Sequence, residues 1–226
     1  MPYQLRDDLS ACDVDGRMVL LDVAHDRYFS LTTDLEQALR THLSHGIVVP
    51  ALLEKLVASA VLVERPECEA DFSAPPPKRP SRSAIEQPRR STESIAANVI
   101  ETTWIVYRMR HKLRSSPLKA VLDEAASYRS SRVVHQPDSS SAATERALIV
   151  AAQSFANARR YVPIEPTCLL DSLSLLRFLS RRGLSARVIF GVTAQPFTAH
   201  CWVQVADMVL NDTVTDAGAY TPIRTI

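Results

Sequence analysis

The chain lacks three features that would place it in a membrane, outside the cell or around a metal. None of its 226 residues belongs to an apolar run of 18 or more, which argues against a transmembrane helix. Residues 1–8 carry neither the basic head nor the apolar core of a signal peptide, so we expect a cytoplasmic protein. The four cysteines include no Cys-x-x-Cys pair, so we expect free thiols, no metal and no cofactor.

The net charge of +1 conceals three segments of different charge. Residues 1–71 hold 6 Lys/Arg and 13 Asp/Glu, whereas residues 72–160 hold 15 and 7. Residues 161–226 hold 5 of each. An acidic head, a basic middle and a neutral tail indicate separate structural units.

A proline-rich segment separates the first two units. Four prolines fall within residues 75–80, in a polar stretch that cannot form a helix or a central strand. We therefore predict a first domain over residues 1–72 and a second over residues 92–226. Residues 73–91 are predicted to be a semi-extended, mostly solvated linker.

The first domain has a pattern typical of a small winged-helix arrangement, in the order β-β-β-α-α-β. Two short apolar segments flank Asp15-Gly16, a pair that favours a two-residue hairpin turn. A third strand is expected over Arg27–Leu31. Two helices follow, over about residues 32–43 and 52–60, and a strand over residues 61–64 ends the unit.

The second domain is predicted to combine helices with an antiparallel sheet, which makes the whole chain α+β. Apolar residues at helical spacing predict helices over about residues 94–113, from Pro117 to a polar loop at 130–141, and over 142–160. A fourth helix begins at Thr167 or Cys168 and ends at Gly183. Strands are predicted over residues 187–192, 200–205 and 208–212.

Cys168 is the candidate nucleophile. It follows Pro166-Thr167 and opens an apolar helix, where unpaired backbone amides and the helix dipole favour an anion. That position lowers the pKa of a thiol and supplies donors for an oxyanion. A buried structural cysteine is the alternative.

His200 is the candidate base. On a strand, it shares one face with Trp202 and Gln204. Cys201 therefore points away from the histidine and is expected to pack as a small hydrophobic residue. This alternation removes Cys201 as the nucleophile and leaves the distant Cys168.

Asp212 is the candidate carboxylate that orients the histidine. In an antiparallel hairpin, its even separation from His200 puts the two opposite each other only across an odd loop. We therefore predict a three-residue loop, Val205–Asp207, or an equivalent bulge, with Asp207 tolerating the left-handed conformation. A two-residue loop would turn Asp212 away, and a strand-end turn residue is its alternative role. Asp171 and Asp216 suit the role less well.

Together these elements carry a resemblance to a known family. The residues concerned are Cys168-Leu169, Ser172-Leu173, Leu176, Leu179, Gly183, Gly191-Val192, Pro196-Phe197, Ala199-His200, Trp202-Val203 and Leu210-Asn211-Asp212. Over about residues 142–215 the chain resembles papain- and transglutaminase-type cores. It resembles more closely the B proteins of lasso-peptide biosynthesis, which are transglutaminase-like leader peptidases. It departs from them at Cys201, where alanine is usual, and at Gln204, where an acidic residue is frequent.

The resemblance implies that Cys168 is the nucleophile, His200 the base and then the acid, and Asp212 the orienting residue. The implied reaction is hydrolysis of one peptide bond after the leader of a precursor, through an acyl-enzyme. The implied partners are that precursor and a separate ATP-dependent cyclase, which closes a macrolactam. Acyl transfer to an amine by the same triad stays open. So does a non-catalytic peptide chaperone, although the intact triad counts against it.

Residues 1–71 also resemble the precursor-recognition element of such pathways, related to the peptide chaperone of pyrroloquinoline quinone biosynthesis. The resemblance implies that the leader adds as a strand to an exposed sheet edge. The residues expected at this site are Arg27, Tyr28, Phe29, Ser30, Leu31, Leu53 and Leu56. A DNA-binding winged helix is the rival interpretation. The excess of seven negative charges opposes phosphate binding, so we expect no nucleic acid partner, and no membrane partner either.

Overall fold

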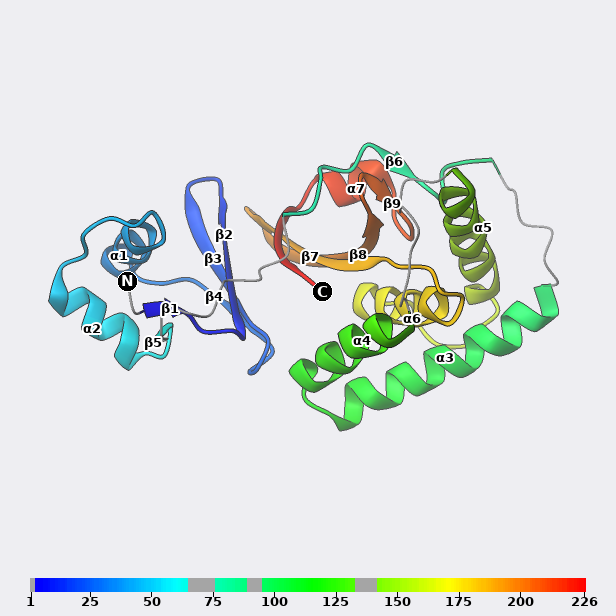
Figure 1. The fold of residues 1–226 in the computed structure, drawn as a ribbon, viewed down its shortest axis with the longest axis horizontal. Coiled ribbons are helices and arrows are strands. Elements are labelled where there is room, and N and C mark those ends of the chain that lie inside the picture. Colours follow the sequence, from blue (N-terminus) through cyan, green and yellow to red (C-terminus); the bar gives the residue numbers. More distant parts are fainter. Residues whose placement is uncertain (1–2, 65–75, 89–94, 133–141) are drawn as a thin grey trace.

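The computed structural model describes residues 3–64, 76–88, 95–132 and 142–226. Helices and mainly antiparallel strands make up an α+β fold, as the sequence predicts (Figure 1). The strands form a two-stranded sheet in the order β1-β5, a three-stranded sheet β2-β3-β4 and a five-stranded sheet β10-β7-β8-β9-β6. The first two sheets belong to the N-terminal region and the third belongs to the C-terminal region.

The N-terminal region has one strand more than its sequence predicts. Its elements are β1 (Tyr3–Leu5), β2 (Leu9–Val14), β3 (Arg17–Asp22), β4 (Arg27–Phe29), α1 (Thr33–Leu43), α2 (Pro50–Ala58) and β5 (Leu62–Glu64). The unpredicted β1 pairs with β5, 57 or more positions along the chain, which no local pattern reveals. The predicted hairpin turn is confirmed, because Asp15 and Gly16 alone separate β2 from β3 and have φ values of 52° and 80°.

The β2-β3-β4 sheet is covered on both faces. Its side chains alternate, so that Met18 and Leu20 enter a core shared with α1 and α2. Val19 and Leu21 enter a second core, which they share with the helices and strands of the C-terminal region. Across this junction the Arg224 guanidinium donates to the main-chain oxygen of Asp7 at 3.2 Å. The N-terminal region is therefore packed onto the C-terminal region through a continuous apolar interface.

Part of the predicted linker is a short strand of the C-terminal sheet, which the sequence did not predict. β6 (Arg82–Ser83) runs parallel to β9 (Met208–Val209), and both Ser83 and Ala84 are buried. No proline occurs between residues 81 and 87, so the amides there are free to pair with the open edge of β9. The predicted linker ends at 73–75 and 89–91 lie outside the described residues, as does the domain boundary at residue 72.

The C-terminal region has the predicted helices and three unpredicted elements. Its elements are α3 (Ile95–Ser115), α4 (Leu118–Arg132), α5 (Ala142–Arg159), α6 (Cys168–Arg181), β7 (Arg187–Ala194), β8 (Phe197–Val205), β9, α7 (Val214–Gly218) and β10 (Thr221–Thr225). Besides β6, neither α7 nor β10 is predicted, and β9 is two residues long where five were expected. Gly183 follows α6 with a φ of 71°, as expected for a helix C-terminus. Most of the predicted polar loop, 133–141, lies outside the described residues.

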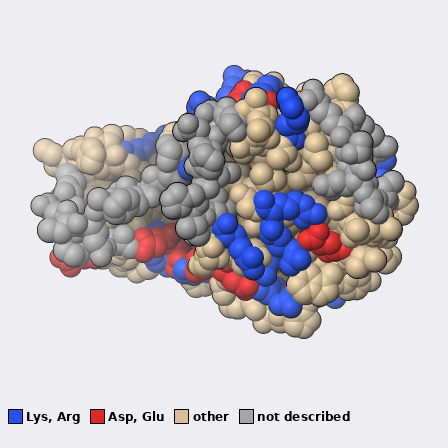
Figure 2. Space-filling model, turned by 45° about the vertical axis from the view of Figure 1, so that its right-hand side comes forward, with Lys and Arg blue, Asp and Glu red and all other residues tan. Residues whose placement is uncertain are grey.

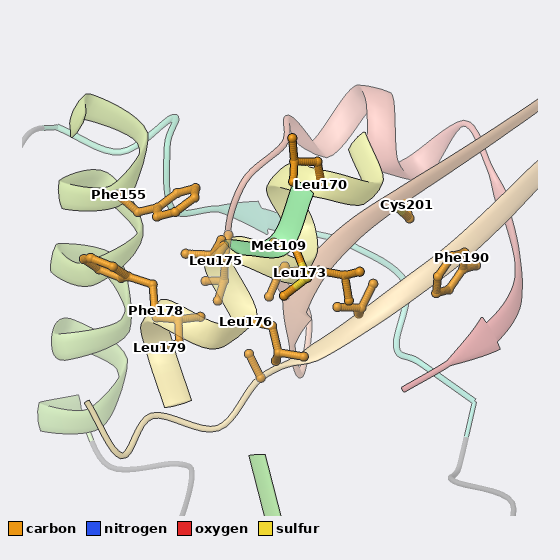
Figure 3. Close-up of a cluster of buried hydrophobic side chains, with 14 of the residues drawn as sticks. Met109, Phe155, Leu170, Leu173, Leu175, Leu176, Phe178, Leu179, Phe190 and Cys201 are labelled. Atoms are coloured by element: carbon orange, nitrogen blue, oxygen red, sulfur yellow. The ribbon is translucent and has the colours of Figure 1, made fainter. Parts of the chain in front are cut away.

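Helix α6 runs through the middle of this second core, which is the core of the C-terminal region, and is buried on nearly all sides. Leu173 and Phe178 have no exposed surface, and Met109 of α3, Phe155 of α5 and Phe190 of β7 lie in the same cluster (Figure 3). Truncating one such leucine to alanine costs about 2–5 kcal/mol, so this packing fixes the helix firmly. The first residue of α6, which is the candidate nucleophile, is held by the same packing.

A mainly apolar groove, with Arg and Lys side chains among its lining, lies between three of the helices. It is lined by residues of α3, α4 and α6 that include Trp104, Arg108, Lys112, Tyr128 and Arg177. Lys and Arg side chains gather on one face of the molecule (Figure 2). None of the candidate catalytic residues lines this groove. Within the described part of the chain, no helix has the length and apolar character needed to cross a membrane.

Candidate active site

Cys168 is the first residue of α6, as its sequence context predicts. The preceding Thr167 is extended, with φ −134° and ψ 143°, and its side chain makes no capping hydrogen bond. The thiol is half-buried, so it combines access from solvent with the positive end of a well-packed helix. This is the environment in which a cysteine is readily ionised.

His200 and Asp212 are in direct contact. The Nε2 atom of His200 is hydrogen-bonded to a carboxylate oxygen of Asp212, which leaves Nδ1 as the nitrogen available to another group. The second carboxylate oxygen of Asp212 accepts a hydrogen bond from the Thr213 amide at 2.8 Å. The two competing carboxylates have other partners: Asp171 pairs with Arg159, and Asp216 accepts from the Thr213 hydroxyl.

The predicted odd loop between β8 and β9 is wrong. The turn has two residues, because Val205 pairs with Met208, and it is Ala206 that has a positive φ, 52°. Continued along the chain, this register would put Thr213 opposite His200 and turn Asp212 away. Asp212 nevertheless meets His200 because the last backbone bond of this ladder joins the Leu210 amide to the Val203 carbonyl, and the chain leaves the sheet before residue 212.

The electrostatics of the two groups complement each other. Hydrogen bonds from the Cys201 side chain and from His200 lower the pKa of the Cys168 thiol to about 4, although partial burial opposes this. Hydrogen bonds to Asp212 and to Cys168 raise the pKa of His200 to about 10. At neutral pH the pair is therefore a thiolate beside an imidazolium, the reactive form of a cysteine nucleophile.

Cys201 has a role in the site that the alternation along the strand did not reveal. It does lie on the face opposite His200, buried in the core with Leu170 and Leu173 (Figure 3). Its side chain also reaches Cys168, and hydrogen bonding to that sulfur together with burial raises the pKa of Cys201 well above its usual value. Cys201 therefore stays protonated and donates to the Cys168 thiolate. A contact between a strand and a distant helix leaves no signal in the local pattern.

Aromatic rings hold the imidazole in place. The His200 ring stacks on Trp202 with a centroid separation of 6.1 Å, and the ring of Tyr220 lies 5.1 Å away. The Trp202 indole donates to the Gln204 side chain at 2.8 Å, which fixes the ring on the predicted common face. Tyr220 comes from the segment between α7 and β10 and was not predicted as a site residue.

The side chains of the residues expected at the leader site point in different directions. Within the described residues β4 pairs with β3 alone, so its outer edge is open, and Ser30 just after it is exposed. Tyr28 points toward the C-terminal region, where its ring lies 5.6 Å from that of Phe197. Phe29 packs in the opposite direction, against the N-terminal core.

The remaining expected leader residues are also placed by the N-terminal core. Arg27 is largely exposed and lies over the Phe29 ring, with its guanidinium carbon 5.3 Å from the ring centroid. Leu31 and Leu53 are half-buried against that core. Leu56 has no exposed surface, because its side chain packs in the interior. The expectation that it contacts a leader is therefore wrong.

Among the described residues, no three His, Cys, Asp or Glu side chains come together as a potential metal site.

Two comparisons with known proteins give a match, one over the C-terminal half of the chain and one over a shorter stretch. A family model described as Transglutaminase-like superfamily matches residues 112–225, just over half of the chain. The chain is 44% identical over 45 residues to the microcin J25-processing protein McjB of Escherichia coli. That alignment covers 20% of this chain and 22% of McjB, so the chain spans about a fifth of the length of this curated relative. No solved structure matches.

Proposed function

This chain belongs to the transglutaminase-like superfamily, and from that premise we propose that it is a cysteine peptidase with Cys168, His200 and Asp212 as its triad. The observation that carries the proposal is the meeting of three groups. They are a thiol of low pKa at a helix N-terminus, a histidine of raised pKa, and a carboxylate bonded to the far nitrogen of that histidine. Nucleophile, acid–base group and orienting group are the parts that acyl transfer requires.

The first half of the proposed reaction forms an acyl-enzyme. The Cys168 thiolate attacks the carbonyl carbon of the scissile bond, and the carbonyl electrons move to oxygen. The unpaired amides of the first turn of α6 are suited to stabilise that oxyanion. When the intermediate collapses, the C–N bond breaks and the His200 imidazolium gives its proton to the leaving amine.

The second half releases the product. Neutral His200 takes a proton from water, whose oxygen attacks the thioester carbon. Breaking the C–S bond restores the thiolate and releases a carboxylic acid, while His200 is again an imidazolium. Asp212 stabilises this cation and keeps the ring oriented throughout, without taking the proton itself.

The proposed substrate is the precursor of a lasso peptide, cut between leader and core. The support is the local similarity to McjB, which is a processing protein for microcin J25. The freed amine of the core would then be available to a separate ATP-dependent cyclase, the second proposed partner.

The proposed leader site is the open edge of β4. Residues Arg27–Phe29 can pair with an added strand, which is the usual way in which sheet edges bind extended peptides. Tyr28 of this strand packs beside Phe197, three positions before His200 along β8. A peptide held on β4 would therefore start near the proposed triad, at high effective concentration for the cut.

The test is cleavage of the precursor peptide encoded beside this gene, followed by mass spectrometry. Wild type should release leader and core, with one water added across one bond, and Cys168→Ala should leave the precursor intact. Cys12→Ala is the matched control, because it removes a different partly buried thiol. Cleavage by Cys168→Ala would refute the assignment of the nucleophile. A product carrying an added amine in place of water would favour acyl transfer over hydrolysis.

A further inference from the structure

In the middle of the proposed site, the hydrogen-bond partner of the β8 edge changes from a strand to a helix. Up to Val203 this edge bonds to the β9 segment, and the Leu210 amide donates to the Val203 carbonyl at 2.8 Å. Two residues further toward the triad, the Cys201 carbonyl accepts a hydrogen bond from the Ser172 hydroxyl of α6 at 3.1 Å. Helix α6 thus takes the place that a longer β9 would occupy.

Asn211 lies at this changeover and bonds to both sides. Its Oδ1 atom accepts the Val203 amide at 2.7 Å, a bond that a backbone carbonyl would make in a regular ladder. Its Nδ2 atom donates to the Ser172 hydroxyl at 3.0 Å. A single side-chain amide therefore closes the ladder and ties it to the helix that carries Cys168.

The substitution of a side chain for the backbone also explains the reach of Asp212. Because the Asn211 side chain takes the Val203 amide, the main chain of residues 211–213 is released from the sheet. The hairpin register then no longer determines where residue 212 lies. Asp212 contacts His200 in the place that the register assigns to Thr213. On its other side, the Asp212 carbonyl is held by the Ser83 hydroxyl at 2.7 Å.

We infer that Asn211 is a positioning residue of the proposed active site. Through Val203 and Ser172 it fixes β8, α6 and the segment after β9 relative to one another, so that Asp212 meets His200 and Cys168 lies beside Cys201. It touches no reacting atom itself. The inference rests on the proposed catalytic roles of Cys168, His200 and Asp212, and adds a residue that sets their spacing.

The test reads the ionisation of Cys168 directly and needs no substrate. The full-length protein is treated with iodoacetamide across a range of pH, and alkylation is followed on the tryptic peptide Tyr161–Arg177, which holds no other cysteine. The reference variants are Asp212→Asn and His200→Ala. In Asn211→Ala the midpoint of alkylation should rise by about one pH unit or more, in the direction of Asp212→Asn, because the carboxylate no longer holds the imidazolium.

A second variant keeps the inference testable even if Asn211→Ala does not fold. Ser172→Ala removes the hydroxyl that joins Asn211 to the Cys201 carbonyl and should shift the midpoint in the same direction. Ser180→Ala is its matched control: Ser180 also donates a buried hydroxyl from α6, to the Leu176 carbonyl, but at the far end of the helix. It should leave the midpoint unchanged while costing similar stability, which thermal unfolding measures.

The outcomes separate this inference from the proposed function. A wild-type midpoint in Asn211→Ala and in Ser172→Ala, with a shifted one in Asp212→Asn, overturns the positioning role and leaves the triad standing. A wild-type midpoint in His200→Ala as well as Asp212→Asn overturns the triad, and the inference with it. A shift of equal size in Ser180→Ala assigns the effect to general loosening of α6 and also overturns the inference.

Discussion

Gly191 of β7 lies directly opposite His200 of β8. A Cβ atom at this position would lie 2.8 Å from the Trp202 ring and 2.8 Å from the Cβ of Tyr220. These are the two rings that flank the imidazole, so the absence of a side chain at residue 191 lets them close on His200.

Gly191→Ala should therefore both destabilise the protein and displace the histidine. Overpacking of this kind costs about 1–3 kcal/mol, and the shifted Trp202 would carry the imidazole away from Asp212. We expect a lower midpoint in urea unfolding and a lower kcat. Gly218→Ala is the matched control, because nothing lies within 4 Å of the added atom. If both variants behave alike, the proposed crowding is not the cause.

The pH dependence of cleavage should follow the thiolate–imidazolium pair. The pKa of Cys168 is about 4 and that of His200 about 10. Activity should rise as pH increases through about 4, where the thiolate forms, and fall as pH increases through about 10, where His200 loses the proton that the leaving amine needs. The measurement is kcat/KM for precursor cleavage against pH. An acid limb near 9, the ordinary pKa of a thiol, would contradict the ion pair.

Cys201→Ala should raise the pKa of Cys168. The variant removes the hydrogen bond that contributes most to the low value, while His200 remains and keeps the pKa below that of a free thiol. Alkylation of Cys168 should then reach half its maximum at a higher pH than in wild type. Cys12→Ala, the control, should leave this midpoint in place. An unchanged midpoint in Cys201→Ala would mean that Cys201 serves packing alone.

Leader binding at β4 is better tested by point substitution than by truncation. Deleting the N-terminal region would remove Val19 and Leu21 and so expose the side chains of the C-terminal region that share a core with them. Ser30→Pro removes one amide just beyond the β4 ladder without touching the pairs with β3. Loss of one hydrogen bond of about 1 kcal/mol should raise the KM for precursor about fivefold at unchanged kcat. Ser30→Ala keeps the amide and serves as the control, and equal KM values for the two would count against this edge.

The local features of the fold could be predicted from the sequence. The start of α6 at Cys168, its end before Gly183 and the Asp15-Gly16 turn depend on a few neighbouring residues. The alternation that separates Cys201 from His200 is likewise fixed by the period of a strand. These predictions needed no knowledge of which elements are in contact.

The contacts between elements could not be predicted in this way. The register argument for Asp212 required an odd loop or an equivalent bulge, whereas the loop is even and the Asn211 side chain replaces a backbone bond at the end of β9. Whether a side chain will compete with a ladder depends on the helix packed beside it. For the same reason the sequence did not reveal β1, β6 or β10, each of which pairs with a segment distant in the chain.

The sequence by itself determined which residues could form a cysteine triad and on which elements they would lie, because helix starts and strand faces are set by short-range geometry. The tertiary structure alone decided that Asp212 reaches His200 across an even hairpin. It also decided that Cys201 bonds to the nucleophile from the opposite face of its strand. Both follow from the packing of α6 against the open edge of β8, a contact fixed by burial and hydrogen bonding between segments about 30 residues apart.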